Sequence, residues 1–340
     1  MSESAMADYN NKETRFILSM LREASALAMT VQNQSALFTV EKSDLSPVTV
    51  ADFAIQALVS HRLFSRFPDA ILVAEEDSAS LRRSEGREML EVITSFVARF
   101  IPEASEEAVC DWIDRGAAAD GGESFWTLDP IDGTKGYRRG GQYAVALAEV
   151  KGSQVMRGAL ACPALSAKEI PGLNDTGLLV FAMRGEGSWM QPLSVMDPGL
   201  ATPLQVNQCA EASQARMLRS FEAAHTDTEA LERLAEALQL DPGANVLMDS
   251  QAKFAVLASG GAEFIFRLLS PDRPGYKECI WDQAAGSLVV EEAGGRVTDL
   301  EGQSLDFSQG RRLKNNTGVL ATNGVLHDVA LDALKTIISS

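Results

Sequence analysis

Two stretches near the beginning of the chain have the spacing of amphipathic helices. Apolar positions in residues 16–31 recur at steps of three and four residues, which is the repeat of one helix face. The same spacing returns after Pro47, where the apolar stripe consists of Ala54, Ile55, Leu58, Val59 and Leu63. Thr49 is placed to cap this second helix. The register puts Asp52 and Gln56 together near the helix start.

Short apolar runs after residue 70 predict strands. Residues 70–74 form one such run, which leads directly into an acidic triplet that begins at Glu75. Residues 78–122 are polar with a helical stripe, so we expect a helical insertion there. Further apolar runs, separated by Gly, Pro and polar turns, predict an antiparallel or mixed sheet at residues 143–150, 158–162 and 177–183.

Past Pro203 the pattern changes to strands that alternate with helices. We therefore expect an N-terminal α+β lobe at residues 1–204 and a C-terminal α/β lobe at residues 205–340. A chain of 340 residues is long enough for two packed lobes with a large core. Hydrophobic residues make up 46% and charged residues 23%, close to globular averages, which predicts a compact soluble protein.

The formal net charge of −17 disfavours nonspecific binding to nucleic acid or to an anionic membrane. The sequence contains no run of about 18 apolar residues, the length that a membrane-spanning helix needs. The four cysteines are far apart, without the CxxC spacing of a zinc site. Residues 1–12 lack the basic and apolar regions of a signal peptide. We therefore expect a monomeric, cytoplasmic protein with a small-molecule substrate, while an organellar form stays open.

The segment WTLDPIDGT, residues 126–134, carries the strongest chemical signal. An apolar strand ends there in two carboxylates, Asp129 and Asp132, which lie three residues apart across a Pro that fixes φ. Gly133 lets the backbone bend sharply just before the Thr134 hydroxyl. Oxygen donors of this kind suit Mg2+, a hard cation that usually keeps some of its waters. The segment therefore predicts a metal-binding turn.

Three other acidic motifs flank this segment in the chain. They are SPVTVAD ending at Asp52, AEED beginning at Ala74 and WDQAAG beginning at Trp281. Each carboxylate alone has an ordinary alternative role as a helix cap or a solvated charge. Together the motifs resemble the lithium-sensitive, magnesium-dependent phosphomonoesterase superfamily of inositol monophosphatases, fructose-1,6-bisphosphatases and 3'(2'),5'-bisphosphate nucleotidases. The resemblance covers about residues 14–325.

Three features resemble the bisphosphate nucleotidase branch in particular. They are the long insertion between Glu75 and Asp129, the segment DSQAK ending at Lys253 and followed by Arg267, and the sequence EAAH ending at His225. This resemblance implies an α/β (α+β) chain with the layered α-β-α-β-α sugar-phosphatase fold and metals between two lobes. It also implies removal of the 3'-phosphate of adenosine 3',5'-bisphosphate, or of 3'-phosphoadenosine 5'-phosphosulfate, by a metal-activated water.

The same resemblance implies a role for each candidate residue. Two or three Mg2+ ions would be held by Glu75, Asp129, the Ile131 main-chain carbonyl, Asp132 and Asp282. Thr134 would orient the attacking water, and Asp52 would accept the proton. Substrate contacts would come from Gly133, Thr134, His225, Ser250, Lys253 and Arg267. Of these, Lys253 and Arg267 are assigned to the 5'-phosphate, which Arg can bind through two parallel hydrogen bonds.

The sequence departs from the family pattern at three places. Ala74 stands where Gly usually precedes the Glu pair, Ala164 replaces a frequent Asn, and residues 226–228 replace a run rich in Ser and His. The last change leaves the adenosine contacts open. Two other interpretations also stay open. An inositol phosphate phosphatase would share every metal ligand, and a catalytically silent nucleotide-binding regulatory protein would share the fold.

Overall fold

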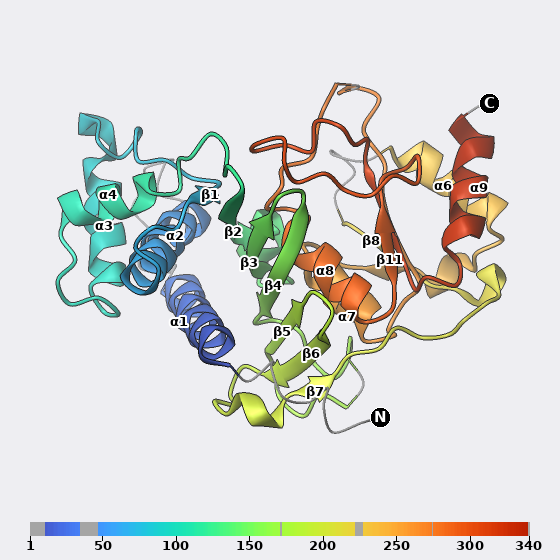
Figure 1. The fold of residues 1–340 in the computed structure, drawn as a ribbon, viewed down its shortest axis with the longest axis horizontal. Coiled ribbons are helices and arrows are strands. Elements are labelled where there is room, and N and C mark those ends of the chain that lie inside the picture. The colour runs from blue at the N-terminus through green and yellow to red at the C-terminus, as the bar shows by residue number, and fades with distance from the viewer. Residues whose placement is uncertain (1–10, 35–46, 171, 222–226, 274, 339–340) are drawn as a thin grey trace.

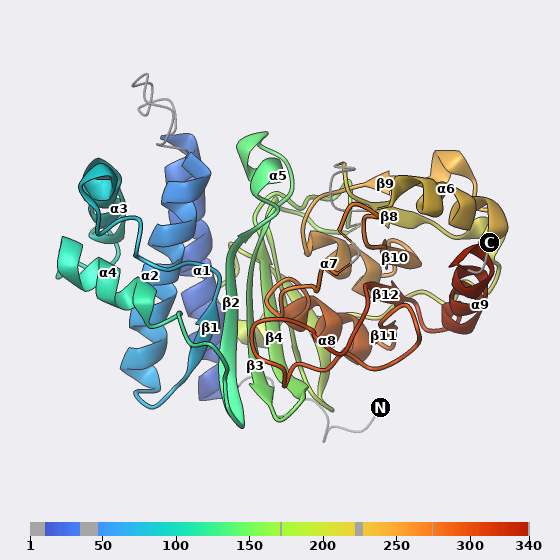
Figure 2. The ribbon, with the colours of Figure 1, turned by 90° about the horizontal axis from the view of Figure 1, so that it is seen from above.

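The computed structural model describes residues 11–34, 47–170, 172–221, 227–273 and 275–338. The chain folds into two sheets with helices outside and between them (Figure 1). Seen from above, the order of layers is helices, sheet, helices, sheet, helices (Figure 2). The predicted α-β-α-β-α arrangement is therefore confirmed.

The first sheet contains seven strands in sequence order. β1 and β2 are parallel, whereas every later neighbour is antiparallel, so the sheet is mixed as predicted. The strands are β1 (Leu72–Ala74), β2 (Ser124–Asp132), β3 (Ala144–Lys151), β4 (Gln154–Cys162), β5 (Leu178–Met183), β6 (Gly187–Pro192) and β7 (Thr202–Pro203).

The second sheet has five strands in the order β11-β12-β10-β8-β9. Its strands are β8 (Met217–Arg219), β9 (Val246–Leu247), β10 (Phe264–Arg267), β11 (Arg296–Thr298) and β12 (Val319–Thr322). β8 is parallel to both of its neighbours, and β12 is antiparallel to both of its own. The first sheet ends at Pro203 and the second begins at Met217, so the lobe division proposed near residue 205 falls between the sheets.

The helices form three layers around these sheets (Figure 2). α1 (Lys12–Asn33) and α2 (Pro47–Arg66) cover the outer face of the first sheet, and the insertion adds α3 (Arg87–Val97) and α4 (Glu106–Asp114) beyond them. Between the sheets lie α7 (Ala252–Ala258) and α8 (Ala284–Glu292). The far face of the second sheet carries α6 (Thr228–Ala237) and α9 (His327–Ile338). Single turns of 3₁₀ helix occur at Ser84–Gly86, Pro198–Leu200, Ala212–Gln214 and Pro242–Ala244.

The start of α2 differs from the prediction. The helix begins at Pro47, so Thr49 lies inside its first turn, and the expected Thr49 cap is wrong. Proline suits this position because its fixed φ is already helical and its missing N–H would have no partner there. The stripe from Ala54 to Leu63 is buried as predicted, with both of these side chains 0% exposed.

The hydrophobic layer between the two sheets joins both halves of the chain. Leu160 and Val180 of the first sheet pack in one core cluster with Leu288 of α8. The contact is close at Gly158, where an added Cβ would come within 2.9 Å of the Ala285 carbonyl oxygen. The lobes proposed here therefore share a core, which holds the two sheets in a fixed relation around the site between them.

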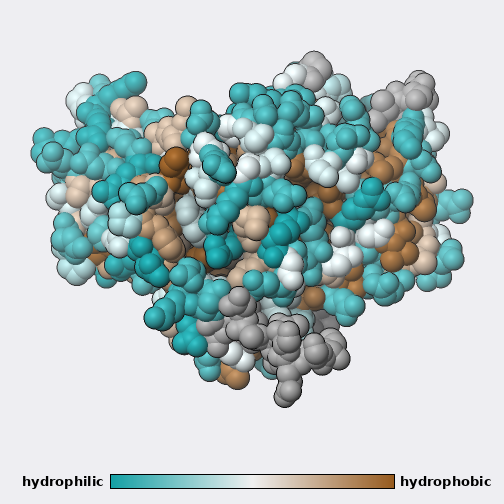
Figure 3. Space-filling view, in the orientation of Figure 1, coloured by the Kyte–Doolittle hydropathy of each residue, from teal (hydrophilic) through white to brown (hydrophobic). Residues whose placement is uncertain are grey.

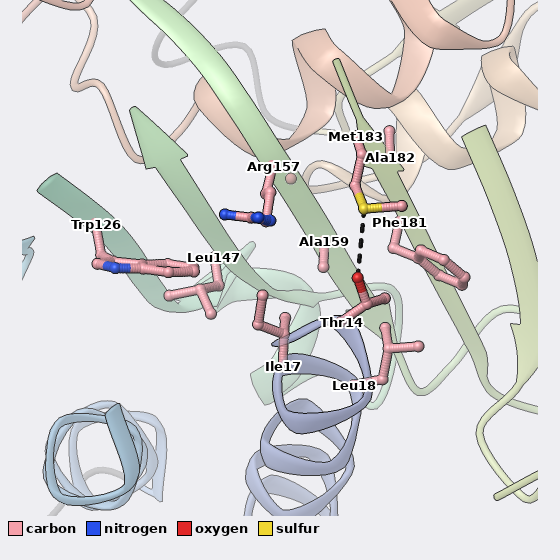
Figure 4. A pocket seen from close by; sticks show the side chains of 11 residues that line it. Thr14, Ile17, Leu18, Trp126, Leu147, Arg157, Ala159, Phe181, Ala182 and Met183 are labelled. Atoms are coloured by element: carbon pink, nitrogen blue, oxygen red, sulfur yellow. Dashed lines mark hydrogen bonds between the residues drawn. The ribbon is translucent and has the colours of Figure 1, made fainter. Parts of the chain in front are cut away.

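Hydrophilic residues cover most of the molecular face in Figure 3, as expected for a net charge of −17. No helix in the described ranges is long and apolar enough to cross a membrane. A cavity of about 10 Å³ lies between the start of α1 and the first sheet, where Thr14 Oγ1 donates to Met183 Sδ at 3.3 Å (Figure 4). It has room for about one water molecule, so it is too small for a substrate.

Candidate active site

A β-bulge at the end of β2 brings Asp129 and Asp132 to the same pocket. Asp129 is opposite Ala146 of β3, whereas Asp132 is opposite Ala144, so β2 contains one extra residue between them. In a regular strand, residues three apart point to opposite faces. The extra residue of the bulge corrects this alternation, and both carboxylates line one pocket.

The parallel pairing of β1 with β2 brings in the next carboxylate. Ala74 is opposite Leu128, so the residues that follow them, Glu75 and Asp129, meet at the ends of neighbouring strands. Gln56 of α2 fixes this strand end, because its side-chain amide donates to the Glu76 carbonyl at 2.6 Å and accepts from the Glu76 N–H at 3.0 Å. Gln56, which the sequence places beside Asp52 near the helix start, therefore holds the backbone of the acidic motif.

Gln251 joins the turn to the segment that carries Asp282. Its main-chain N–H donates to the Asp132 carboxylate at 2.5 Å. Its side-chain amide donates to the Trp281 carbonyl at 3.0 Å and accepts from the Gly286 N–H at 3.1 Å. α8 begins two residues after Asp282. Three main-chain segments distant in sequence are thus held together by one residue.

The pocket between the sheets has a volume of about 630 Å³, which is large enough for a nucleotide. It is lined by nearly all the candidate residues, namely Glu75, Asp129, Ile131, Asp132, Gly133, Thr134, Ser250, Lys253, Arg267 and Asp282. Two candidates are exceptions. Asp52 does not line the pocket, and His225 falls outside the described residues.

Burial raises the pKa of Glu75, Asp129, Asp132 and Asp282, and repulsion between neighbouring carboxylates adds to the rise for Glu75, Asp129 and Asp282. Burial is the largest cause for Asp129, and the charges of Glu75 and Asp132 add to it. The pKa of Asp282 rises for the same two reasons, with Asp132 as its strongest neighbour. The pKa of Asp132 is raised less strongly, because the hydrogen bond from the Gln251 amide favours the charged form of this carboxyl. So many acids in one desolvated place are costly unless a cation compensates them.

The donor set fits a divalent cation. Asp129 is 3% exposed, and its Oδ1 has no hydrogen-bond partner among the described residues. Such an orphaned buried oxygen is expected of a metal ligand observed without its metal. Within the residues that the structure describes, no three His, Cys, Asp or Glu side chains converge closely enough to enclose an ion alone. Waters, the Ile131 carbonyl and substrate oxygens would therefore complete the ligand shell, as is usual for Mg2+.

Two basic side chains, Lys253 and Arg267, also line the pocket. Burial lowers the pKa of Lys253 to about 8, while the nearby Asp132 carboxylate opposes that shift. Lys253 Nζ donates to Ser220 Oγ at 2.7 Å. Arg267 forms an ion pair with the buried Glu278 carboxylate at 3.1 Å. Burial works against the charge of Arg267, but Glu278 and Asp282 outweigh it and raise its pKa.

The predicted turn at Gly133 has the expected backbone. Gly133 has a φ of 87° and immediately precedes α5 (Thr134–Arg138). It lies against Ser250, which itself has a φ of 68°, and an added Cβ on Gly133 would come within 2.7 Å of the Ser250 Cβ. Left-handed backbone at a non-glycine residue is costly and is typical of functional sites.

Asp52 and Thr134 do not form a hydrogen bond with each other in this structure, although both are described. Thr134 is exposed, whereas Asp52 is 6% exposed. The Oδ1 atom of Asp52 has no partner in the described part of the chain. Burial raises the pKa of Asp52 well above its usual value, and the charges of Glu75 and Glu76 add to this. Asp52 is therefore a buried acid beside the acidic motif, behind the pocket wall.

Several residues at the site were not predicted. The sequence presents Gln251 only as part of the DSQAK motif, and nothing in it indicates the ion pair that Asp249 forms with Arg139. Arg311 and Glu278 carried no signal, because each acts through a partner distant in sequence. Only their burial or pairing in three dimensions identifies them.

The layered arrangement of sheets and helices is shared with solved structures of inositol monophosphatases. Thermotoga maritima IMPase aligns with a TM-score of 0.64 at 19% identity, covering 97% of this chain and 99% of that one. The inositol monophosphatase from Anabaena (Nostoc) sp. PCC 7120 aligns with a TM-score of 0.56 at 20% identity, covering 94% and 95%. The inositol monophosphatase family model matches residues 6–339, and the chain belongs to this family.

Within the family, the chain is similar to proteins named 3'(2'),5'-bisphosphate nucleotidase. The relative from Emericella nidulans is 35% identical over 94% of this chain and 96% of its own length. The one from Oryza sativa is 40% identical over 93% and 91%, and the one from Dictyostelium discoideum is 36% identical over 87% and 88%. The resemblance inferred from the sequence is confirmed, and the family fold implies metal-dependent catalysis.

Proposed function

We propose that the protein is a Mg2+-dependent phosphomonoesterase that removes the 3'-phosphate of adenosine 3',5'-bisphosphate, and also of 3'-phosphoadenosine 5'-phosphosulfate. The observation that carries this proposal is one pocket whose lining combines the carboxylates of Glu75, Asp129, Asp132 and Asp282 with the cations of Lys253 and Arg267. A substrate with two phosphates can use both sets of side chains at once, one phosphate at the metal-binding carboxylates and the other at the two cations. The names of the similar relatives support the same substrate class.

The carboxylates of the pocket are assigned to the reacting phosphate. Glu75, Asp129, Asp132, Asp282 and the Ile131 carbonyl would hold two or three Mg2+ ions. When bound, these ions would polarise the phosphate and lower the pKa of a water. The Thr134 hydroxyl orients the attacking water. Asp52 is the proposed acceptor of the proton from this hydroxyl, because its buried Oδ1 has no partner in the described part of the chain. The two side chains are not hydrogen-bonded in this structure, so the proposal requires them to come together when substrate binds.

The remaining pocket residues bind the rest of the nucleotide. Lys253 and Arg267 bind the 5'-phosphate, with Ser250 and Gly133 lining the space between the two phosphates. We keep His225 as a candidate adenosine contact on the basis of its sequence motif alone. The net charge of −17, together with the cations of Lys253 and Arg267 in the pocket, favours a small anionic substrate over nucleic acid or membrane. A monomer in the cytoplasm completes the proposal.

Phosphate release tests this function directly. Purified protein with Mg2+ should release phosphate from adenosine 3',5'-bisphosphate much faster than from inositol 1-phosphate or fructose 1,6-bisphosphate, and lithium should inhibit it. Asp132→Asn should abolish release, which distinguishes an enzyme from a silent nucleotide-binding protein. Faster turnover of inositol 1-phosphate would instead assign the chain to the inositol phosphate phosphatases.

A further inference from the structure

Two large apolar side chains of the pocket are open to solvent. Phe221 and Leu247 both line the pocket, yet they keep 57% and 52% of their surface exposed. They lie close together because β8 and β9 are paired in parallel with Arg219 opposite Leu247, and Phe221 follows just past the end of β8. Large apolar side chains exposed inside a pocket are typical of a ligand-binding surface.

Arg139 holds the Phe221 ring in place. Its guanidinium carbon lies 5.3 Å from the ring centroid, a distance at which a cation is attracted to an aromatic face. The same guanidinium forms an ion pair with Asp249, which is only 6% exposed. Arg139 directly follows α5, the helix that begins at Thr134. The ring is therefore fixed from the side of the catalytic turn while much of it stays open.

The ring also stands near Lys253. Lys253 Nζ contacts the Oγ atom of Ser220 at 2.7 Å, and Ser220 is the residue before Phe221. A ligand whose phosphate binds Lys253 therefore has Phe221 within reach of the group it carries next to that phosphate. In a nucleotide, the ribose and its base follow the 5'-phosphate.

We propose that Phe221, held by Arg139, is the platform on which the nucleobase of the substrate stacks, with Leu247 covering the edge of the base. A base has a flat π face, which stacks on an aromatic side chain whatever its hydrogen-bonding pattern. An inositol or fructose ring has no such face. The platform therefore selects nucleotides over sugar phosphates. This inference rests on the proposed nucleotidase function and extends it to the choice of substrate.

Binding of the reaction product without metal tests the platform. Titration calorimetry in the presence of a chelator should compare adenosine 5'-phosphate with ribose 5-phosphate. Phe221→Ala should weaken adenosine 5'-phosphate binding roughly tenfold, within the range found when a stacking aromatic is replaced by alanine, and should leave ribose 5-phosphate unchanged. Phe221→Trp should keep the adenosine 5'-phosphate affinity. Leu200→Ala is the matched control, since Leu200 is 66% exposed but does not line the pocket.

The possible results distinguish failure of the stacking platform from failure of the proposed nucleotidase function. Equal weakening of both ligands by Phe221→Ala, or weakening of neither, would overturn the platform. A wild-type protein that does not bind adenosine 5'-phosphate without metal would also overturn it, because stacking needs no ion. The nucleotidase function fails by a different result, namely no phosphate release from adenosine 3',5'-bisphosphate by the metal-loaded wild type.

Discussion

The guanidinium of Arg311 lies over the Trp281 ring, with its central carbon 4.6 Å from the ring centroid. The same side chain donates to the Ala74 carbonyl at 2.5 Å and to the Glu75 carbonyl at 3.3 Å. Arg311 thus joins the strand end that carries Glu75 to the residue before Asp282. The two carboxylates are 207 residues apart in sequence, and one planar cation contacts the segments that carry both.

Replacing Arg311 should disturb metal binding more than folding. We expect Arg311→Ala to raise the Mg2+ concentration needed for half-maximal turnover at least several-fold, because Glu75 and Asp282 would no longer be held together. Arg311→Lys should restore little, since an ammonium cannot donate to two carbonyls while it stacks on the indole. Calorimetric titration with Mg2+ should show the same weakening without any turnover.

Arg184→Ala provides the control for lost hydrogen bonds alone. Arg184 donates to the Val155 carbonyl at 3.1 Å and pairs with Glu291 at 2.7 Å, away from the pocket. The Arg184→Ala variant should lower the melting temperature as much as Arg311→Ala does, yet leave the Mg2+ concentration needed for half-maximal turnover unchanged. If both variants alter the requirement equally, Arg311 has no specific positioning role.

The pKa of Lys253 predicts a pH dependence of substrate binding. Burial lowers this pKa to about 8, so the ammonium is charged below pH 8 and loses its charge as pH rises above it. The KM for adenosine 3',5'-bisphosphate should therefore rise above pH 8, whereas the KM for adenosine 3'-phosphate, which lacks the 5'-phosphate, should not. The ratio of the two values cancels pH effects on the reacting phosphate.

Lys253→Arg is the matched variant for this measurement. A guanidinium keeps its charge throughout the accessible pH range, so the rise in the KM ratio above pH 8 should disappear. A ratio that rises equally in the variant and in the wild type would mean that another group titrates, and would remove Lys253 from the 5'-phosphate site.

Much of this architecture could be predicted from the sequence because it depends on local patterns. The stripe at residues 16–31 lies within α1, and the runs at residues 143–150 and 177–183 correspond to β3 and β5. Side-chain periodicity of 3.6 or 2 residues is set by the backbone itself. The four acidic motifs could be found for the same reason, since each is contiguous in the chain.

The bulge and the inter-lobe contacts could not be predicted in this way. Asp129 and Asp132 share a pocket only because β3 contributes one residue fewer between them, and a strand's register is decided by its partner. Gln251 contacts Asp132 across 119 residues of sequence, and no local pattern marks such a pair. The platform at Phe221 likewise requires Arg139 and Asp249 to meet in space.

His327 predicts an acid-sensitive step in stability. The ring is 0% exposed and bridges Thr298 and Thr322, with each nitrogen 3.0 Å from a threonine Oγ1. Burial, together with the charge of Arg296, lowers its pKa to about 4. The unfolded chain binds this proton near pH 6.5, so the neutral histidine stabilises the fold above that pH, and the contribution is lost as pH falls toward 4.

Urea unfolding of the wild type and of His327→Gln should reveal this contribution. The wild type should lose roughly 2 to 3 kcal/mol of unfolding free energy more than the variant between pH 7.5 and pH 4.5. Glutamine can hydrogen-bond but does not titrate, so effects of the other acids cancel in the difference. An identical pH dependence in both proteins would show that His327 does not take up a proton on unfolding in this range.

Thr134 offers the sharpest test of the catalytic assignment, because the role of its hydroxyl can be separated from the shape of its side chain. Thr134→Val keeps the shape but removes the hydroxyl, and we expect it to lower kcat by about 10²- to 10⁴-fold, the range for loss of a group that handles a proton. Thr134→Ser should retain most of the activity. Mg2+ affinity should be the same in all three proteins, since the carboxylates hold the ion. Stopped-flow phosphate release measures kcat, and calorimetric titration measures the Mg2+ affinity. Wild-type turnover in Thr134→Val would show that the Thr134 hydroxyl does not orient the attacking water.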